Sequence, residues 1–481
     1  MTILHYFLGF PPLHSGGLMI YVKDLVIEQQ NKGHNILLLF PGVIQNYKAK
    51  SKIKYYKNYN GIKIFQLVNP QYFSFNGIFD PKKSVKDKYI KNIDKFLNKY
   101  RIEIIHVHSL MGFPKELLFE ARKSGIKIIF STHDYYGICP TINLYNKENK
   151  ICIDYNEGNE CIKCNNKYDK HGILKRNILI SFTIFYKIFL ASIVKFKSLY
   201  KIIRIIYKYF RIFKNKLIKK NENKLKNNVI KNIEYYNFRN YYINILKNFD
   251  LIIFNSYVTK ETFSQYIDIK NIKYKVIPVT HSKIRDYRNI FKYEPLKDNK
   301  INFIYLGYLD HRKGFFDLIN VLEDVKKEYS NWQLHIYADY SNIDIVKYDK
   351  DFYKFYGKYN YEDLSEIFST ASLIIVPSKW KETFGLIGLE AYSYGIPALV
   401  SENVGFSIVI NKNKNGIVYK ENKDNIYLKK SIINILEKPE ILKEINQAIL
   451  KNANFYDYLI ENHTKQIIEC YRNLINSGYI L

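Results

Sequence analysis

The sequence predicts an α/β protein with two domains, each built from strands that alternate with helices. A strand, a glycine-containing turn, a helix and a second strand follow one another over residues 3–40, which is the order of a βαβ unit. The same alternation begins again at residue 301, after a linker near 283–300. With 481 residues, of which 47% are hydrophobic, the chain is long enough and apolar enough to form two sizeable cores.

Buried strands are predicted where short apolar runs end at glycine, proline or polar residues. In the first domain these runs are 3–9, 35–40, 62–68, 102–107, 126–131, 250–256 and 275–278, with helices predicted over 18–32 and 114–123. In the second domain they are 301–307, 333–338, 352–356, 373–377 and 397–401. We expect residues 1–135 to form a doubly wound parallel sheet. Ligands of such folds bind beyond the carboxyl ends of the strands, so polar residues at those ends are the candidate site.

Positive charge is concentrated in one segment of the first domain. The formal net charge of the chain is +29, which indicates an anionic partner such as a phosphate-rich substrate, a nucleic acid or an acidic lipid surface. Residues 165–250 hold 20 Lys and Arg against 4 Asp and Glu. No recognisable nucleic-acid-binding module accompanies this charge, so we do not expect a nucleic acid as partner.

An apolar stretch, residues 177–194, lies inside this basic segment and contains a single Lys. Its length of about 18 residues is just enough to span a bilayer. Its polar interruptions, and the basic and aromatic residues that follow over 195–220, favour instead a helix that lies on an anionic membrane surface. An ordinary helical hairpin packed on the protein is the alternative.

The cysteines are few, and four of the five lie close together in the sequence. The N-terminal residues show neither the basic region nor the small-residue cleavage site of a secretion signal, so we expect a cytoplasmic protein, in which a cysteine cluster favours metal over disulfides. Cys139, Cys152, Cys161 and Cys164, the last two in a C-x2-C spacing, predict a structural zinc site. Four reduced, unligated thiols are the alternative. Cys470 is predicted to be buried on a C-terminal helix.

Glu382 and Glu390 form the strongest candidate site. They stand in the run Pro377-Ser-Lys-Trp-Lys-Glu-Thr-Phe-Gly-Leu-Ile-Gly-Leu-Glu390, in which a predicted strand ends at Pro377 and Gly385 opens a helix. A helix start with small residues offers free N–H groups and a positive dipole to phosphate. The two carboxylates can accept hydrogen bonds from sugar and ribose hydroxyls at that place, whereas an isolated pair of glutamates is more often a solvated surface feature.

This run resembles the Glu-x7-Glu signature of glycosyltransferase family 4. The resemblance continues downstream in Glu390-Ala-Tyr-Ser-Tyr-Gly-Ile-Pro397 and upstream in Gly307-Tyr-Leu-Asp-His-Arg-Lys-Gly314. It covers both predicted domains outside an insertion at about residues 139–249, and a subset of the family carries a similar insertion with cysteines. The resemblance implies a retaining enzyme of the GT-B fold, in which two Rossmann-like domains face each other across a cleft.

The implied division of the chain has three parts. Residues 1–285 would form the acceptor-side domain, which contains the cysteine-bearing, basic, helical insertion. Residues 286–454 would form the nucleotide-sugar-binding domain. Residues 455–481 would form a C-terminal helix that crosses back to the first domain.

The resemblance also implies roles on the donor side of the site. Glu382 would position the donor sugar and Glu390 the ribose of a UDP- or GDP-linked donor. Lys313 and the helix start at Phe384 and Gly385 would hold the diphosphate. The family's arginine after its first glycine is replaced here by Tyr308, which weakens the expected charge clamp, and Arg312 is the nearby residue that would compensate.

On the reacting side, Gly16-Gly17 resembles the loop whose backbone approaches the donor phosphates and the acceptor. Glycine suits this because no Cβ blocks the approach. His133 and Asp134 follow a predicted strand and resemble the family's His-Asp motif, which implies that His133 lies near the reacting sugar.

Two further groups of residues at strand ends can serve the fold rather than the site. His106 and His108 stand at the end of another predicted strand, where they can serve the site or only the fold. Asn255-Ser256 is predicted to be structural, with Ser256 as the cap of the next helix.

Taken together, these features predict a glycosyltransferase for surface glycan synthesis, acting on a lipid-linked or polysaccharide acceptor. We expect it to lie on the inner face of the membrane as a peripheral protein. The sequence has no Asp-x-Asp motif at a strand end, so we expect the chemistry to need no metal ion. Two alternatives remain, namely a non-catalytic membrane-associated scaffold with this fold, and an epimerase or phosphorylase with this fold.

Overall fold

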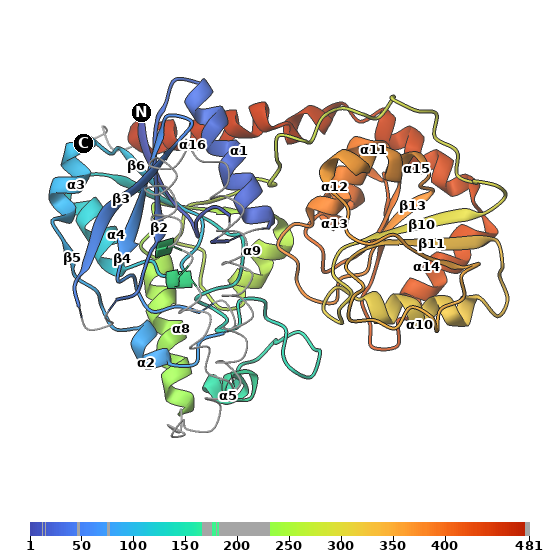
Figure 1. Ribbon diagram of the computed structural model, residues 1–481, viewed down its shortest axis with the longest axis horizontal. Coiled ribbons are helices and arrows are strands. Elements are labelled where there is room, and N and C mark those ends of the chain that lie inside the picture. The colour runs from blue at the N-terminus through green and yellow to red at the C-terminus, as the bar shows by residue number, and fades with distance from the viewer. Residues whose placement is uncertain are drawn as a thin grey trace, which may run out of the picture.

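The computed structural model describes residues 1–476 except for 12, 15, 46–48, 75–76, 166–175, 179 and 182–230. Two α/β domains lie side by side, and the C-terminal helix returns to the first domain (Figure 1). The predicted membrane-surface segment, 177–194 with 195–220, lies almost entirely outside the described residues. Among the residues that are described, none of the helices combines the length and apolarity needed to cross a membrane.

Within the described part of the chain, the first domain contains a nine-stranded sheet in the order β5-β3-β4-β2-β1-β6-β7-β8-β9. The strands are β1 (Thr2–Tyr6), β2 (Asn35–Pro41), β3 (Ser51–Tyr59), β4 (Ile62–Val68), β5 (Ile90–Lys91), β6 (Ile104–Val107), β7 (Lys127–Ser131), β8 (Leu251–Phe254) and β9 (Tyr274–Val276). The helices are α1 (Gly17–Asn31), α2 (Pro81–Ser84), α3 (Ile93–Lys99), α4 (Lys115–Lys123), α5 (Asn159–Cys164), α8 (Asn232–Leu246) and α9 (Tyr257–Ser264), with a 3-10 turn at Asn156–Gly158.

One edge of this sheet differs from the sequence prediction. β3 pairs with β4 in the antiparallel direction, so the prediction of a purely parallel sheet over residues 1–135 is wrong here. The two strands are joined at Asn60 and Gly61, both of which have positive φ. Two such residues form the tight turn of a β-hairpin, which reverses the chain direction.

The second domain contains a parallel sheet in the order β12-β11-β10-β13-β14-β15, which is the 3-2-1-4-5-6 order of Rossmann folds. Its strands are β10 (Ile301–Leu306), β11 (Trp332–Tyr337), β12 (Tyr353–Phe355), β13 (Leu373–Val376), β14 (Ala398–Ser401) and β15 (Ile417–Tyr419). Its helices are α10 (Phe315–Val325), α11 (Leu364–Ser369), α12 (Leu386–Ser393), α13 (Ser407–Asn413), α14 (Ile426–Glu437) and α15 (Glu440–Leu450), with 3-10 turns at Tyr361–Asp363 and Ala453–Tyr458.

The central strands are buried along their whole length because helices cover both faces of a parallel sheet. β10 illustrates this, since all six of its residues are buried. The continuous apolar runs by which these strands were predicted have the same cause.

The last helix, α16 (Ile460–Asn476), packs against α1 of the first domain. In Figure 1 the red α16 lies beside the blue α1. Hydrogen bonds join the two helices at Tyr21 and His463 (3.0 Å) and at Gln29 and Tyr471 (3.1 Å). Cys470 on α16 is buried, as predicted. The last described helix is therefore part of the first domain's core.

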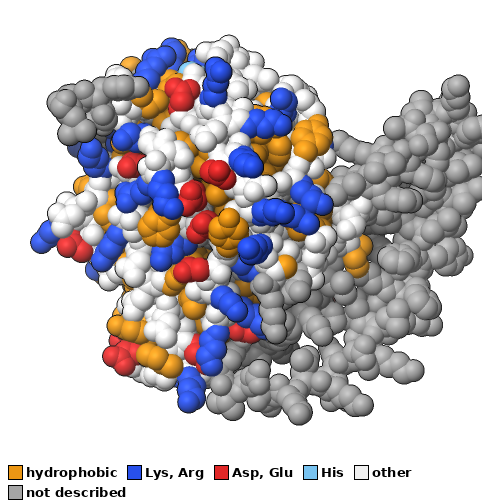
Figure 2. Space-filling view, turned by 90° about the vertical axis from the view of Figure 1, so that its left-hand side faces the viewer, with side chains coloured by type: hydrophobic (Ala, Val, Ile, Leu, Met, Phe, Trp, Pro, Cys, Tyr) orange, Lys and Arg blue, Asp and Glu red, His pale blue; other side chains and the backbone are white. Residues whose placement is uncertain are grey.

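Basic side chains are spread over the outer face of the first domain. Figure 2 shows Lys and Arg interspersed with acidic, hydrophobic and uncharged side chains on this face. The most basic stretch of the sequence, residues 165–250, is largely outside the described residues.

Candidate active site

Four of the predicted site residues follow strands at or next to the point where each sheet reverses its strand order. In the first sheet this point lies between β1 and β6, and in the second between β10 and β13. Gly17 follows β1, and His133 follows β7 next to β6. Lys313 follows β10, and Glu382 follows β13. Ligands bind at such switch points because the loops diverge there and leave a crevice.

Glu382 is held by an ion pair on one carboxylate oxygen and a hydroxyl on the other. Lys313 Nζ lies 2.7 Å from Oε1, and Ser378 Oγ donates to Oε2 at 2.7 Å. Burial raises the pKa of the Glu382 carboxyl, but Lys313 and Ser378 outweigh it and bring the pKa below its usual value. Glu382 is therefore ionised and fixed in direction, while 12% of its side chain remains exposed.

The cations near Glu382 are stacked around Trp380. The ring centroid lies 5.7 Å from Lys313 Nζ and 5.1 Å from the Arg312 guanidinium. Arg312 also pairs with Asp310 at 3.6 Å. Tyr308, which stands where the resemblance to family 4 predicts an arginine, is 71% exposed. The site thus has two clustered cations, each already facing one carboxylate.

The starts of α1 and α12 lie close to each other across the two domains. A Cβ atom on Gly17 would lie 3.4 Å from Leu386 Cδ1, the first residue of α12, and a Cβ on Gly16 would meet no atom within 4 Å. The residue before α12, Gly385, has φ +91°, and a Cβ there would come within 2.6 Å of Val404. Only glycine fits this turn, and the starts of the two helices, each with free N–H groups, lie close together.

Phe384 is buried at the base of this turn. It is 2% exposed, and its carbonyl accepts a hydrogen bond from the backbone N–H of Phe406 at 2.6 Å. Its role in the structure is to anchor the turn that precedes α12, since its side chain is packed away from solvent.

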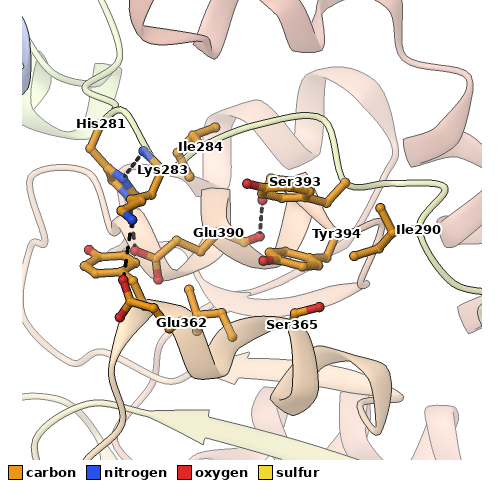
Figure 3. A pocket seen from close by; sticks show the side chains of 12 residues that line it. His281, Lys283, Ile284, Ile290, Glu362, Ser365, Glu390, Ser393 and Tyr394 are labelled. Carbon is orange, nitrogen blue, oxygen red and sulfur yellow. Dashed lines mark hydrogen bonds and ion pairs between the residues drawn. The ribbon is translucent and has the colours of Figure 1, made fainter.

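Glu390 lines a cavity of about 340 Å³ between α12, the segment before β10 and the turn before α11 (Figure 3). His281 Nε2 lies 3.2 Å from Glu390 Oε1. Burial and then the charge of Glu390 raise the pKa of the neighbouring Tyr361 phenol. Glu390 is 3% exposed, and its Oε2 atom has no hydrogen-bond partner among the described residues.

His133 lies at the carboxyl end of β7 between two side chains. Its Nε2 is 3.3 Å from His108 Nδ1, and its Nδ1 is 3.3 Å from Asn255 Nδ2. Burial and then the nearby His463 lower the pKa of His133 to about 3, so the ring is neutral at physiological pH. Burial raises the pKa of the adjacent Asp134 to about 6.

Thr383 joins the donor-side loop to the first domain. Its carbonyl accepts hydrogen bonds from Ser256 Oγ at 2.7 Å and Thr259 Oγ1 at 2.9 Å. Its own hydroxyl lies 3.4 Å from the carbonyl of His133. Ser256 also accepts from the Thr259 N–H and so caps α9, as predicted. Glu382 and His133 are therefore brought to the same place by direct contacts between the domains.

Sequence reasoning missed several residues that hold the predicted ones. Ser378 and Trp380 lie inside the motif that contains Glu382, and their polar and aromatic side chains were available signals. His281 and Tyr361 reach Glu390 from segments far away in the sequence, and no spacing rule connects them to it.

The four clustered cysteines line one small cavity together with Arg239. Burial raises the pKa of Cys152 to about 11 and that of Cys161 to about 12. Arg239 Nη2 lies 3.9 Å from Cys161 Sγ, and its Nε and Nη1 have no hydrogen-bond partner among the described residues. Four thiolates around Zn²⁺ carry a net negative charge, which such a buried guanidinium would balance.

No three of the four cysteine sulfur atoms, all of them in the described part of the chain, lie within 4.8 Å of one another. Among the described residues, the group whose ligand atoms lie close enough to share one ion is His5, His106 and His108 instead. The sulfurs would have to draw together to bind zinc, and the zinc site therefore stays a prediction.

Residues 286–452 match the family model described as Glycosyl transferases group 1, which covers about a third of the chain. Sucrose-phosphate synthase from Thermosynechococcus elongatus is 15% identical, with a TM-score of 0.56 and coverage of 99% of both chains. HepE of Anabaena in complex with UDP is 12% identical, with a TM-score of 0.53 and coverage of 98% of this chain and 100% of that chain. The fold is GT-B.

A curated relative from Klebsiella pneumoniae, described as an uncharacterized 41.2 kDa protein in the cps region, is 28% identical over 123 residues. These residues are 26% of this chain and 34% of the relative. The chain thus spans about a third of the length of this relative.

Proposed function

We propose that this chain is a retaining glycosyltransferase that moves a sugar from a UDP- or GDP-linked donor to a lipid-linked or polysaccharide acceptor in surface glycan synthesis. The observation that carries the proposal is the position of the Lys313–Glu382 pair next to Thr383, whose hydroxyl contacts the carbonyl of His133 in the other domain. The group 1 domain at 286–452 and the UDP complex of a structural neighbour support a nucleotide-sugar donor. The cps-region relative supports a surface glycan as product.

In the proposed reaction, the bond between the sugar C1 and the β-phosphate oxygen breaks, and its electron pair leaves with the nucleoside diphosphate. The acceptor hydroxyl forms a new bond to C1 on the same face, and its proton passes to the departing phosphate oxygen. Positive charge on the sugar and negative charge on the phosphate both increase in the transition state.

Each side of the site would stabilise one of these charges. Lys313 and the N–H groups at the starts of α1 and α12 are placed for the phosphate. Glu382 is ionised and directed by Ser378, so it can accept from sugar hydroxyls. A neutral His133 can hydrogen-bond the sugar without adding positive charge to it. Glu390, in its buried cavity, would accept from the ribose.

Release of nucleotide from several UDP- and GDP-sugars, by purified protein supplied with membranes, tests the proposal. We expect release from one donor, increased by a membrane acceptor and lost in Glu382→Ala. If no donor releases nucleotide and Glu382→Ala changes nothing in cells, a scaffold is the better reading. Nucleotide release without sugar transfer to any acceptor, together with an altered sugar, would indicate an epimerase. Nucleotide release that depends on inorganic phosphate would indicate a phosphorylase.

We further propose that the basic segment 165–250 holds the protein on the inner face of the membrane. Each basic residue near anionic lipid contributes about 1 kcal/mol, and this segment holds 20 of them. Flotation with vesicles that contain phosphatidylglycerol tests this. Deletion of residues 177–220 should abolish flotation, and unchanged flotation of the deletion variant would contradict the proposal.

The cysteine cluster is proposed to bind one structural zinc ion. Elemental analysis of protein purified without added metal should find about one zinc per chain, and none in the Cys161→Ser/Cys164→Ser variant. Cys470→Ser, which removes a buried thiol elsewhere, is the control and should retain the metal. Metal-free wild-type protein would leave the cysteines as reduced thiols.

A further inference from the structure

Beneath His133, a line of buried polar side chains runs through the first domain to α16. From the site inward, Asn255 Nδ2 lies 3.3 Å from His133 Nδ1, His133 Nε2 lies 3.3 Å from His108 Nδ1, and His108 Nε2 lies 2.9 Å from His5 Nδ1. His5 Nε2 lies 2.7 Å from Gln29 Oε1. The line is continuous across β8, β7, β6, β1 and α1.

From Gln29 the line continues to the C-terminal helix and back into the sheet. Gln29 Nε2 donates to the Tyr471 hydroxyl at 3.1 Å, Tyr471 contacts His106 Nδ1 at 2.6 Å, and His106 Nε2 contacts Ser131 Oγ at 2.7 Å. His5, His106 and His108 are each 0% exposed. Both ring nitrogens of each of these three histidines are therefore paired.

The hydrogen bonds of this line can all run in one donor-to-acceptor direction. A neutral imidazole has one donor and one acceptor nitrogen, so each ring can accept on one side and donate on the other. With Asn255 donating to His133 Nδ1, the proton of His133 must lie on Nε2 and point to His108, and the same assignment follows for His108 and His5. Gln29 then accepts from His5 through its oxygen and donates to Tyr471 through its nitrogen.

This arrangement needs every ring to be neutral. A protonated imidazole would donate from both nitrogens and meet another donor. Burial first, and then neighbouring histidines, lower the pKa values of His106 and His108 well below the usual value, and burial lowers that of His5 to about 4. The chain of contacts is thus complete at physiological pH.

We propose that His108, His5, Gln29 and Tyr471 are positioning residues that hold His133 in one tautomer, with the proton on Nε2, and so couple the seating of α16 to the reacting side of the site. The two contacts of His133 are the longest of the line, at 3.3 Å, whereas three of the inner ones are 2.6–2.7 Å. His133 is the member that can exchange a partner for a sugar hydroxyl. The effect on catalysis rests on the proposed function, whereas the tautomer does not.

A metal ion at His5, His106 and His108 is the competing reading of this cluster. Their ligand atoms lie within 4.8 Å of one another. A metal would need ring nitrogens that now bind Gln29, Tyr471, Ser131 and each other, and the described contacts place no carboxylate on these rings to balance its charge. The satisfied hydrogen bonds therefore favour the positioning role.

The test compares two tyrosines that join the same two helices. Tyr471→Phe removes the hydroxyl that links Gln29 to His106. The control Tyr21→Phe removes the hydroxyl that binds His463, which is outside the line, and keeps the aromatic ring that packs against His133 at a centroid distance of 5.0 Å. We expect nitrogen-15 NMR of labelled histidine to show changed ring signals for His133 in Tyr471→Phe, identified by their loss in His133→Gln, and unchanged signals in Tyr21→Phe.

Kinetics provide the second readout. Since small misplacements of a catalytic group cost up to about 100-fold, we expect kcat to fall about tenfold in Tyr471→Phe with the donor KM nearly unchanged. His108→Gln, which retains a donor and an acceptor, should keep more activity than His108→Phe.

Three results would overturn the proposal. Unchanged His133 ring signals in Tyr471→Phe would mean that the tautomer does not depend on the line. Equal loss of kcat in both tyrosine variants would indicate general destabilisation. One metal ion per chain that disappears in His108→Gln would assign the cluster to metal binding. If the NMR result holds and no donor is turned over by wild-type protein, the proposed function fails while the positioning line stands.

Discussion

One domain contributes charged side chains to the site, and the other contributes neutral ones. On the C-terminal side, Lys313 and Glu382 are charged, paired at 2.7 Å and partly exposed. On the N-terminal side, His133 and the histidines behind it are neutral and connected by hydrogen bonds. The difference suits a reaction in which the leaving phosphate gains negative charge while the sugar gains positive charge. Charges are held where the diphosphate would bind, and a positive histidine is avoided where the sugar would react.

We expect the largest effect on activity from a substitution in the Lys313–Glu382 ion pair. Glu382→Gln keeps the shape of the side chain but leaves Lys313 without its partner and the sugar without a charged acceptor. We expect kcat/KM for the donor to fall about 10³-fold, which is the size of effect seen when one preorganised electrostatic contact is removed. Steady-state nucleotide release measures it.

A similar ion pair in the same domain provides the control for this variant. Glu421 pairs with Lys379 at 2.5 Å, and its side chain is 13% exposed against 12% for Glu382. Glu421→Gln should retain kcat/KM within about threefold, because Lys379 also pairs with Asp317. Equal losses in the two variants would mean that Glu382 serves stability rather than the reaction.

The neutral half predicts a particular dependence of stability on pH. Burial lowers the pKa of His5 from 6.5 to about 4, and that of His463 to about 4. Between pH 6.5 and about 4 the unfolded chain therefore binds protons that the folded chain does not, so stability is full above pH 6.5 and falls as pH is lowered. Protonation of one such histidine costs about 3 kcal/mol.

Three carboxyls of the described residues act in the opposite direction. Burial raises the pKa of Asp134 to about 6 and also raises the pKa values of Glu116 and Glu421, so their contribution to stability falls as pH rises through these values. The histidines with lowered pKa values outnumber these carboxyls, and we expect the urea midpoint at pH 5 to lie below that at pH 7. His5→Gln should reduce this difference. A midpoint that does not change with pH would mean that these rings are not neutral in the folded state.

The sequence predicted much of the fold because the strands are buried on both faces. Continuous apolar runs such as those of β4 and β10 have that cause and were located to within a residue or two. β3 was missed because its exposed lysines and tyrosines give no such run, although Asn60-Gly61 marked the hairpin.

The site was less predictable than the fold. Motif residues such as Glu382 and Lys313 could be named in advance, since a local spacing carries them. Their surroundings could not, because contacts such as His281 to Glu390 and Tyr471 to His106 join residues 109 and 365 positions apart. Only the folded sheet and the returning α16 bring such pairs together.

The cavity around Glu390 allows a more moderate test of the donor half. Glu390→Gln should raise the donor KM about tenfold with little change in kcat, because one hydrogen bond to a charged group is worth about 1.5 kcal/mol. Glu362 at the same cavity is exposed and pairs loosely with Lys283 at 3.4 Å, so Glu362→Gln is the control. A fall in kcat with an unchanged KM in Glu390→Gln would argue against a ribose contact.

The smallest expected effect comes from restoring the missing cation. Tyr308 stands where related enzymes are expected to place an arginine, and its 71% exposed side chain leaves room for a longer one. Tyr308→Arg would add a charge that is partly screened by water, worth about 0.2–1 kcal/mol, so the donor Kd should tighten up to about fivefold. Isothermal titration with the nucleoside diphosphate measures this, and Tyr308→Gln controls for the loss of the ring. A lower Kd in Tyr308→Arg but not in Tyr308→Gln would support the assignment of diphosphate binding to the charged C-terminal side of the site. Unchanged or weaker binding would mean that Arg312 already supplies the charge that the diphosphate needs.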